Sequence, residues 1–198
     1  MIDLLAMTKQ FAIFNDREND HAYFRTNLPS SGPMAYLNVV FKPVRVDVLE
    51  YAKSTLELPE PIVQFLAAQN GAILFSGALN VYGAVGPHQL LNRSDPLSLP
   101  PLDLIGENKN WLLREPDRFL IIGAYGFDGT RICIDRFSSQ IYLFDVDESG
   151  LRQRGAAIWS DLDNWLLSEV QRLSSIFDPS GRPLAPMSET APRKTRAN

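Results

Sequence analysis

The stretch LPEPIVQFLAAQNGAILF, residues 58–75, decides how the chain is expected to fold. Pro59 suits the first position of a helix, where its missing N–H group would have no partner. Apolar residues then repeat at helical spacing over 62–66, which predicts a helix. Asn70 and Gly71 end this pattern, since glycine adopts the left-handed conformation that often follows a helix end. The apolar residues after Gly71 predict a strand, so the stretch turns a corner between a helix and a strand.

The rest of the chain carries helical and strand patterns on both sides of this corner. Asp47 and Glu50 have the spacing of a capping box, and Ser160 and Asp163 repeat that spacing near the C-terminus. Helices are predicted over 47–57, 102–113 and 160–177, and the pattern of 3–14 is compatible with another. Strands are predicted over 37–41, 72–75, 78–83, 118–125, 130–137 and 140–146, with an edge strand over 153–158.

The order of these elements predicts an α+β fold. Asp128-Gly129 is a strong hairpin signal, because glycine supplies the positive φ of a tight turn without strain, and it favours a meander. We expect a central, mostly antiparallel sheet of about five to six strands packed against helices. Residues 1–45 are expected to form an N-terminal extension on or beside this core domain, which spans 46–177.

The last residues, 178–198, contain four prolines and few large apolar side chains. Such a segment cannot bury enough surface to offset the entropy lost on ordering, so we expect a flexible, disordered tail. This tail carries a net charge of +2, from four basic and two acidic residues, whereas the whole chain carries −4. The first 177 residues therefore carry −6. An acidic body disfavours nucleic acid and favours basic partners, although it also serves simple solubility.

Composition indicates one domain of a protein without membrane spans. The chain has 198 residues, of which 45% are hydrophobic and 21% charged, and this length suits one domain with appendages. No run approaches the roughly 18 apolar residues of a membrane span, and the N-terminus lacks the pattern of a secretory signal. Cys133 is the only cysteine, which excludes an internal disulfide and fits a reducing compartment. We therefore expect a cytoplasmic protein.

Motifs for cofactors and metals fail on their structural context. Phosphate-binding loops lead from a strand into a helix N-terminus, whereas Gly71 follows a helix end. The glycine triplet within 123–129 joins two strands and lacks the spacing of a dinucleotide motif. The acidic run that starts at Asp145 resembles the start of a calcium loop, but Ala156 stands where that loop needs a carboxylate. We expect no cofactor and no metal.

Nucleophilic and acid–base chemistry were weighed as alternatives. Cys133 would need a nearby histidine to act as a nucleophile, and the chain has only His21 and His88. We expect Cys133 to be a small, half-buried strand residue. Asp161 and Asp163 suit the start of a helix, where carboxylates interact favourably with the helix dipole. The sequence thus predicts no catalytic residue, and a small hydrolase using Cys133 or a carboxylate pair is the alternative.

Three blocks of the chain resemble the SUKH superfamily, which includes fungal regulators of cell-wall assembly and bacterial immunity proteins of toxin systems. LPEPIVQFLAAQNG is similar to the family's Leu-Pro, amphipathic helix and closing Asn-Gly. FLIIGAYGFDGTRICIDRFSSQIYLFD is similar to its strands with a glycine-bearing turn, and SDLDNWLLSEV is similar to its closing helix. In the first two blocks the matching positions are Leu58, Pro59, Phe65, Leu66, Asn70, Gly71, Ile122, Gly123, Gly126, Gly129, Ile134, Asp135, Ile141, Tyr142 and Asp145.

The resemblance covers about 46–177 and implies a single SUKH-like domain that binds another protein and is not an enzyme. Immunity members of such families neutralise a toxin by direct contact, often a nuclease, and nucleases tend to carry basic surfaces. We therefore expect an immunity-type protein whose acidic body is steered toward a basic toxin domain. A regulatory or scaffold role in cell-wall assembly or signalling is the alternative. The predicted partner-binding residues, which otherwise serve as ordinary turn residues, are Asp128, Asp145, Asp147 and Glu148.

Overall fold

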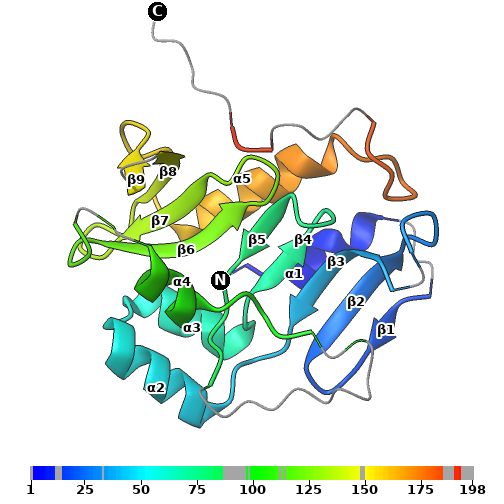
Figure 1. Cartoon of the computed structure of the whole chain (residues 1–198). Coiled ribbons are helices and arrows are strands. Elements are labelled where there is room, and N and C mark those ends of the chain that lie inside the picture. Colours follow the sequence, from blue (N-terminus) through cyan, green and yellow to red (C-terminus); the bar gives the residue numbers. More distant parts are fainter. Residues whose placement is uncertain are drawn as a thin grey trace, which may run out of the picture.

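Nine strands form one open antiparallel sheet in the computed structural model (Figure 1), which describes residues 2–11, 15–32, 34–86, 97, 99–111, 113, 115–147, 150–184 and 190–192. Each strand pairs with its neighbours in the sequence. The α+β class and the meander are confirmed, but the predicted number of about five to six strands was too low. The strands are β1 (Arg17–Glu18), β2 (Ala22–Asn27), β3 (Tyr36–Phe41), β4 (Ala72–Leu74), β5 (Leu79–Val81), β6 (Phe119–Tyr125), β7 (Arg131–Asp135), β8 (Ile141–Asp147) and β9 (Gly150–Gln153).

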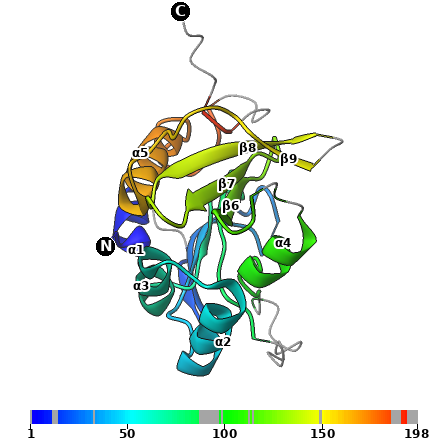
Figure 2. The ribbon, with the colours of Figure 1, turned by 90° about the vertical axis from the view of Figure 1, so that its left-hand side faces the viewer.

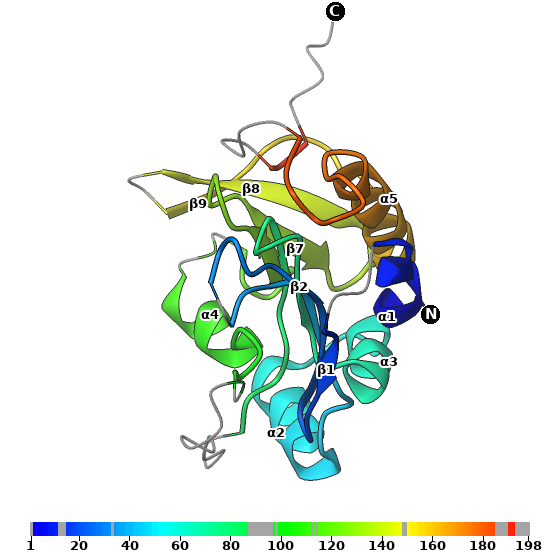
Figure 3. The same ribbon diagram turned by 90° about the vertical axis from the view of Figure 1, so that its right-hand side faces the viewer.

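Helices cover both faces of this sheet. On one face lie α1 (Leu4–Met7), α3 (Glu60–Ala68) and α5 (Leu162–Ser174), and on the other lies α4 (Leu104–Asn110) (Figure 2, Figure 3). Helix α2 (Val46–Leu56) contacts both α3 and α4. The strands β3 and β6 are therefore buried along their whole length, as expected for strands packed on both faces. In the part of the chain that is described, every helix is too short or too polar to span a bilayer.

The N-terminal region is part of the sheet. A 3-10 turn, Thr8–Gln10, follows α1, and the next described residues lead into the first three strands. Strand β3 joins them to the rest, because Val39 pairs with Ile73 and Val40 pairs with Ala72 of β4. The extension that we expected to pack on or beside the core thus supplies one end of the sheet. Its strands β1 and β2 account for part of the missed strand number.

Neither of the two predicted capping boxes forms at the N-terminus of its helix. Helix α2 begins after Arg45, and the Asp47 carboxylate pairs with the Arg45 guanidinium at 2.6 Å instead of capping the helix. Helix α5 is capped by Asp161, whose Oδ1 accepts the N–H of Asn164 at 2.8 Å. The spacing rule found both helices, but α2 has no side-chain cap, and α5 is capped by Asp161 instead of Ser160. The apolar stripe of α5 is buried as predicted, through Leu162, Trp165, Leu166, Val170 and Leu173.

The corner after α3 depends on a close approach between two stretches of main chain. Pro59 was predicted to take the first position of the helix, but it is the cap residue that precedes α3. Gly71 has φ +88°, and a Cβ atom there would lie 2.7 Å from the carbonyl oxygen of Val81. The Asn70 side chain donates to the carbonyl of Ala84 at 2.9 Å and accepts its N–H at 2.7 Å. The chain after β5 is thereby tied to the end of α3.

The turn between β7 and β8 is organised by Asp135, which is buried at the end of β7. Its Oδ1 accepts the N–H groups of Phe137 at 2.9 Å and Ser138 at 3.1 Å, and its Oδ2 accepts from Arg118 Nε at 2.8 Å. Burial alone would raise the pKa of Asp135, but these hydrogen bonds outweigh it and lower the pKa below its ordinary value. The ionised carboxylate therefore stabilises the turn.

The chain beyond β8 differs from prediction in two places. Strand β9 lies over Gly150–Gln153, earlier than the predicted 153–158, because Gly155 has φ +126° and ends the extended pairing. In the predicted flexible tail, the described residues 178–184 and 190–192 contact the body. Leu184 N–H donates to the Ile176 carbonyl at 2.9 Å, and residues 190 and 191 are buried. The predicted loop over 84–101 lies largely outside the described residues.

The corner yields a stability prediction for Gly71→Ala. The new Cβ would combine a strained positive φ with a clash against main chain, so we expect a loss of at least about 2 kcal/mol in the free energy of unfolding. Urea denaturation measures this loss. The control is Gly129→Ala, because Gly129 also has positive φ, +72°, but no atom lies within 4 Å of its built Cβ. Equal losses in both variants would show that the close approach does not matter.

A second prediction concerns Asp135→Asn and pH. A carboxylate whose pKa is lowered by folding contributes stability that is present above its unfolded pKa and is lost as pH falls through the folded pKa. We expect the variant to be less stable by about 1–2 kcal/mol at pH ~6, with the difference shrinking toward pH ~3. Urea denaturation across this range measures it. The exposed Asp117→Asn should change stability by less than about 0.5 kcal/mol, and a pH-independent difference for Asp135 would contradict the assignment.

Candidate functional site

Two of the predicted partner-binding carboxylates lie together where the β6–β7 turn meets β8 and β9. Asp128 lies in that turn, and Asp145 and Asp147 lie on β8, whereas Glu148 is outside the described residues. Asp128 and Asp145 belong to one hydrogen-bonded group, which is joined through Thr130 and Arg154. Asp147 is exposed at the end of β8. The structure thus brings together two of the four predicted residues.

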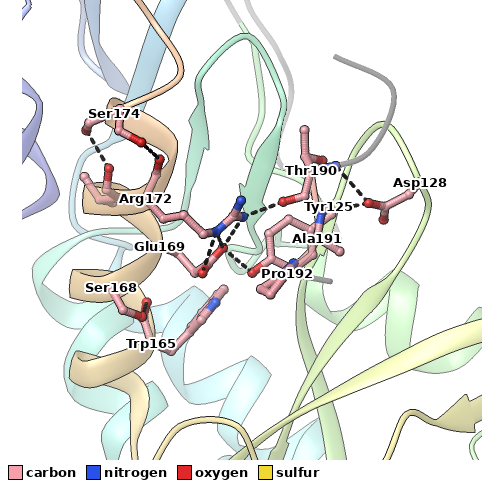
Figure 4. Close-up of polar contacts among 12 residues, drawn as sticks. Tyr125, Asp128, Trp165, Ser168, Glu169, Arg172, Ser174, Thr190, Ala191 and Pro192 are labelled. Carbon is pink, nitrogen blue, oxygen red and sulfur yellow. Dashed lines mark hydrogen bonds and ion pairs between the residues drawn. The ribbon is translucent and has the colours of Figure 1, made fainter. Parts of the chain in front are cut away.

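Asp128 binds the main chain of the C-terminal segment. Its Oδ1 accepts the N–H of Thr130 within its own turn at 3.0 Å. Its Oδ2 accepts two successive N–H groups, from Thr190 at 3.0 Å and from Ala191 at 2.7 Å (Figure 4). An ionised carboxylate that receives such bonds makes the stronger, charge-assisted type of hydrogen bond. Asp128 is therefore more than an ordinary turn residue.

Arg172 of α5 binds the same segment from another side. Its guanidinium donates to the Thr190 carbonyl and, through Nε, to Glu169 Oε1 at 3.0 Å (Figure 4). The Glu169 side chain is only 3% exposed, and its Oε2 accepts the Tyr125 hydroxyl at 2.6 Å. Burial lowers the pKa of Arg172, but its hydrogen bonds to Glu169 outweigh burial and raise it. The charge of the buried Glu169 carboxylate is thus compensated within the body of the protein.

Tyr125 completes this buried group as a neutral donor. Burial raises the pKa of its hydroxyl well above the ordinary value, and the neighbouring Glu169 carboxylate raises it further. The phenol therefore keeps its proton and donates it to Glu169. Each charged group in this part of the site has a fixed partner, so the group positions Arg172 and does not prepare a proton transfer.

Arg154 supplies the third contact to the segment. Its Nη1 donates to the carbonyl of Pro192 at 3.2 Å, and its Nη2 donates to Thr130 Oγ1 at 2.8 Å. Its Nε donates to Asp145 Oδ1 at 2.7 Å. Asp145 therefore acts through Arg154, which it orients. We call the three side chains Asp128, Arg154 and Arg172 the seat, since together they bind the main chain of residues 190–192.

The seat recognises peptide main chain and not a reacting group. Its three side chains come from the β6–β7 turn, the residue after β9 and helix α5, and they bind two N–H groups and two carbonyl groups. Glu169 and Arg172 were missed by sequence reasoning, although Glu169 stands among apolar residues in the stripe of α5. A charged residue at a core position is a signal that a buried partner is present. Arg154 carried no comparable signal for a contact with residue 192.

The residues considered for catalysis are placed elsewhere. Cys133 is fully buried, not half-buried as predicted, because it shares its face of β7 with Arg131, which contacts Glu107 of α4, and its partner on β8 is Tyr142. Burial raises the pKa of its thiol well above the ordinary value, although Arg131 opposes this. His21 is exposed near β2, toward the other end of the sheet, and His88 lies outside the described residues. The carboxylates of Asp161 and Asp163 lie at the start of α5, where Asp161 caps the helix.

A second polar group lies on the α4 side of the sheet. Glu107 Oε2 accepts the Tyr82 hydroxyl at 3.2 Å and Trp111 Nε1 at 3.0 Å, and Arg131 Nη2 lies 3.5 Å from it. Burial raises the pKa of Tyr82 above the ordinary value. These contacts attach α4 to β5 and β7. Among the described residues, no group of three or more His, Cys, Asp and Glu side chains is arranged to bind a metal ion.

Comparisons with known proteins place the chain in no family. No family model matches it, and no characterised protein matches it at a significant level.

The Glu169 network yields a prediction for Tyr125→Phe. Loss of the hydroxyl removes a hydrogen bond to a buried carboxylate, so we expect the free energy of unfolding to fall by about 1.5–3 kcal/mol. Tyr142→Phe is the matched control, because the Tyr142 hydroxyl makes a long contact of 3.3 Å with Gln140 and its loss should cost less than about 0.5 kcal/mol. Chemical denaturation of both variants measures the difference. A neutral effect of Tyr125→Phe would rule out a stabilising role for the network.

Proposed function

We propose that the chain is a non-enzymatic protein-binding module of the SUKH kind, an immunity-type protein that binds and neutralises a partner toxin with a basic surface. The observation that carries this proposal is the seat, where charged side chains from separate elements bind peptide main chain. Two of the predicted partner-binding residues, Asp128 and Asp145, belong to this part of the surface. The resemblance of residues 46–177 to the SUKH superfamily supplies the immunity role and the class of partner.

Charge supports a basic partner. Residues 1–177 carry a net charge of −6, derived from −4 for the whole chain and +2 for residues 178–198. A negative body accelerates encounter with a positive partner and disfavours acidic ones. Basic surfaces are typical of nucleases, because their substrates are polyanions. A nuclease toxin domain therefore fits the charge of this chain.

Exposed apolar side chains next to the carboxylates also support protein binding. Phe127 precedes Asp128 in the β6–β7 turn and is 47% exposed, and Val146 stands between Asp145 and Asp147 and is 43% exposed. Protein interfaces combine apolar and aromatic residues at their centre with charged residues around them. The end of the sheet that carries β6–β9 is therefore the surface that we assign to the partner.

The test is binding to the toxin domain encoded by the adjacent reading frame. We expect the purified full-length chain to bind that domain and suppress its toxicity, with affinity falling at least about tenfold between ~0.05 and ~0.5 M salt because exposed charges are screened. Asp147→Asn should weaken binding at low salt, mainly through slower association. Calorimetry and stopped-flow mixing measure the two effects.

Asp20→Asn is the matched control for Asp147→Asn. Asp20 is an exposed aspartate between β1 and β2, at the opposite end of the sheet, and its neutralisation removes the same charge. If both variants lose affinity equally, net charge matters but the assigned surface does not. If the adjacent reading frame encodes no toxic domain, or if that domain does not bind, the immunity role is rejected.

A further inference from the structure

We infer that the seat is a peptide-binding site for a short segment of a partner polypeptide, and that residues 190–192 occupy it as an intramolecular ligand that the partner displaces. This inference deepens the proposed function, on which it rests for the existence of a protein partner. According to this inference, the seat binds the main chain of the partner at a place where the adjoining side chains are small. The contacts of the seat, drawn in Figure 4, carry the inference in four steps.

The first step is that the seat is fixed without its occupant. Arg172 is oriented by two oxygens of the buried Glu169, which Tyr125 in turn contacts. Arg154 is oriented by Asp145 and by Thr130, whose N–H also fixes Asp128. None of these contacts involves residues 190–192. A site that is preorganised in this way loses little side-chain entropy when it binds a ligand.

The second step is the chemistry of the ligand. The seat accepts the N–H groups of two successive residues and donates to the carbonyls of the first and the third. The third residue, Pro192, has no N–H group to satisfy, so proline is tolerated there. Thr190 is 0% exposed and Ala191 8%, which restricts the first two side chains to small ones. The ligand is therefore a small-small-proline tripeptide that bends at its middle residue, so that two successive N–H groups reach one carboxylate oxygen.

The third step is that the present occupant fits imperfectly. Thr190 Oγ1 is buried and has no hydrogen-bond partner among the described residues. A buried hydroxyl without a partner weakens binding, and an isosteric apolar side chain avoids this loss. A segment with valine at the first position should therefore bind more tightly than one with threonine. A partner segment can thus have a higher affinity for the seat than residues 190–192 and displace them.

The fourth step is the advantage of the tether. A segment attached to the same chain reaches an effective concentration on the order of millimolar. The occupant can therefore fill the seat even if its intrinsic affinity is weak. It would mask the seat until a partner segment with higher affinity arrives, so binding to the wild-type protein must be weaker than binding to a protein whose seat is vacant.

The experiment vacates the seat in the full-length chain and adds the ligand as a peptide. The double variant Thr190→Pro and Ala191→Pro removes both N–H groups that Asp128 accepts, and leaves the body unchanged. The probe is a capped peptide with the sequence of residues 188–194, SETAPRK. We expect it to shift the amide signals of residues 128–130 in NMR spectra and to bind the vacated variant at least about tenfold more tightly than the wild type.

Matched peptides and variants separate the seat from general charge attraction. The scrambled peptide TPESKAR has the same charge and should bind at least tenfold more weakly than SETAPRK, as should SEPPPRK, which lacks both N–H groups. The valine peptide SEVAPRK should bind at least about threefold more tightly. Adding Asp128→Asn to the vacated variant should weaken binding of SETAPRK at least tenfold, without a change in the NMR spectrum of α5.

Several outcomes overturn the inference. One is a vacated variant that is folded but does not bind SETAPRK at millimolar concentration, provided that a second vacating variant, Ala191→Trp, gives the same result. The others are equal binding to the wild type and the vacated variant, or equal binding of the scrambled peptide. No toxin enters this titration, so its failure leaves the salt-dependent binding of the toxin domain untouched. Conversely, if the peptide binds but no toxin domain binds the protein, the peptide-binding role of the seat is supported and only the immunity role is rejected.

Discussion

The structure depends on the close main-chain approach at the corner between α3 and β4. Gly71 lies against the carbonyl of Val81, and a Cβ atom on Gly83 would lie only 2.1 Å from the carbonyl oxygen of Asn70. Two glycines on facing segments therefore permit a contact that no other residue pair allows without movement of the backbone. The Asn70 amide then satisfies both main-chain groups of Ala84. Strands β4 and β5, which this contact aligns, join β1–β3 to β6–β9 in one sheet.

The local pattern of the sequence was enough to predict the elements around this corner. Periodicity located α3, α5 and the strands β6 to β8, because each of them alternates or repeats over its own length. It failed where the contact partner is distant in the sequence. In strand β2, Ala22 and Phe24 are buried against a cluster of residues from β3 and Leu97, which lie elsewhere in the sequence. At the helix starts, Asp47 pairs with the Arg45 side chain and Asp161 takes the place of Ser160, and the spacing rule considers neither contact.

The same limit explains the outcome for the candidate site. Asp128 and Asp145 were predicted from their charge and their position near turns; Asp128 belongs to the seat, and Asp145 orients Arg154 of the seat. Their contacts could not be predicted, since Asp128 binds residues 62 and 63 positions away. A segment rich in proline predicts disorder because it cannot bury much apolar surface. Here residues 190–192 of that segment are bound by charged side chains through their main chain, which composition does not encode.

The ends of the sheet have a consequence for the behaviour of the protein in concentrated solution. An open sheet leaves unpaired N–H and C=O groups along its first and last strands, and these groups can recruit another chain into aggregates. Here β1 has only two residues, both charged, and β9 has four, of which Arg152 and Gln153 are exposed. Such brief and polar borders offer little template for intermolecular pairing. The protein can therefore keep strands as apolar as β3 and β6 in its interior while remaining resistant to edge-to-edge association.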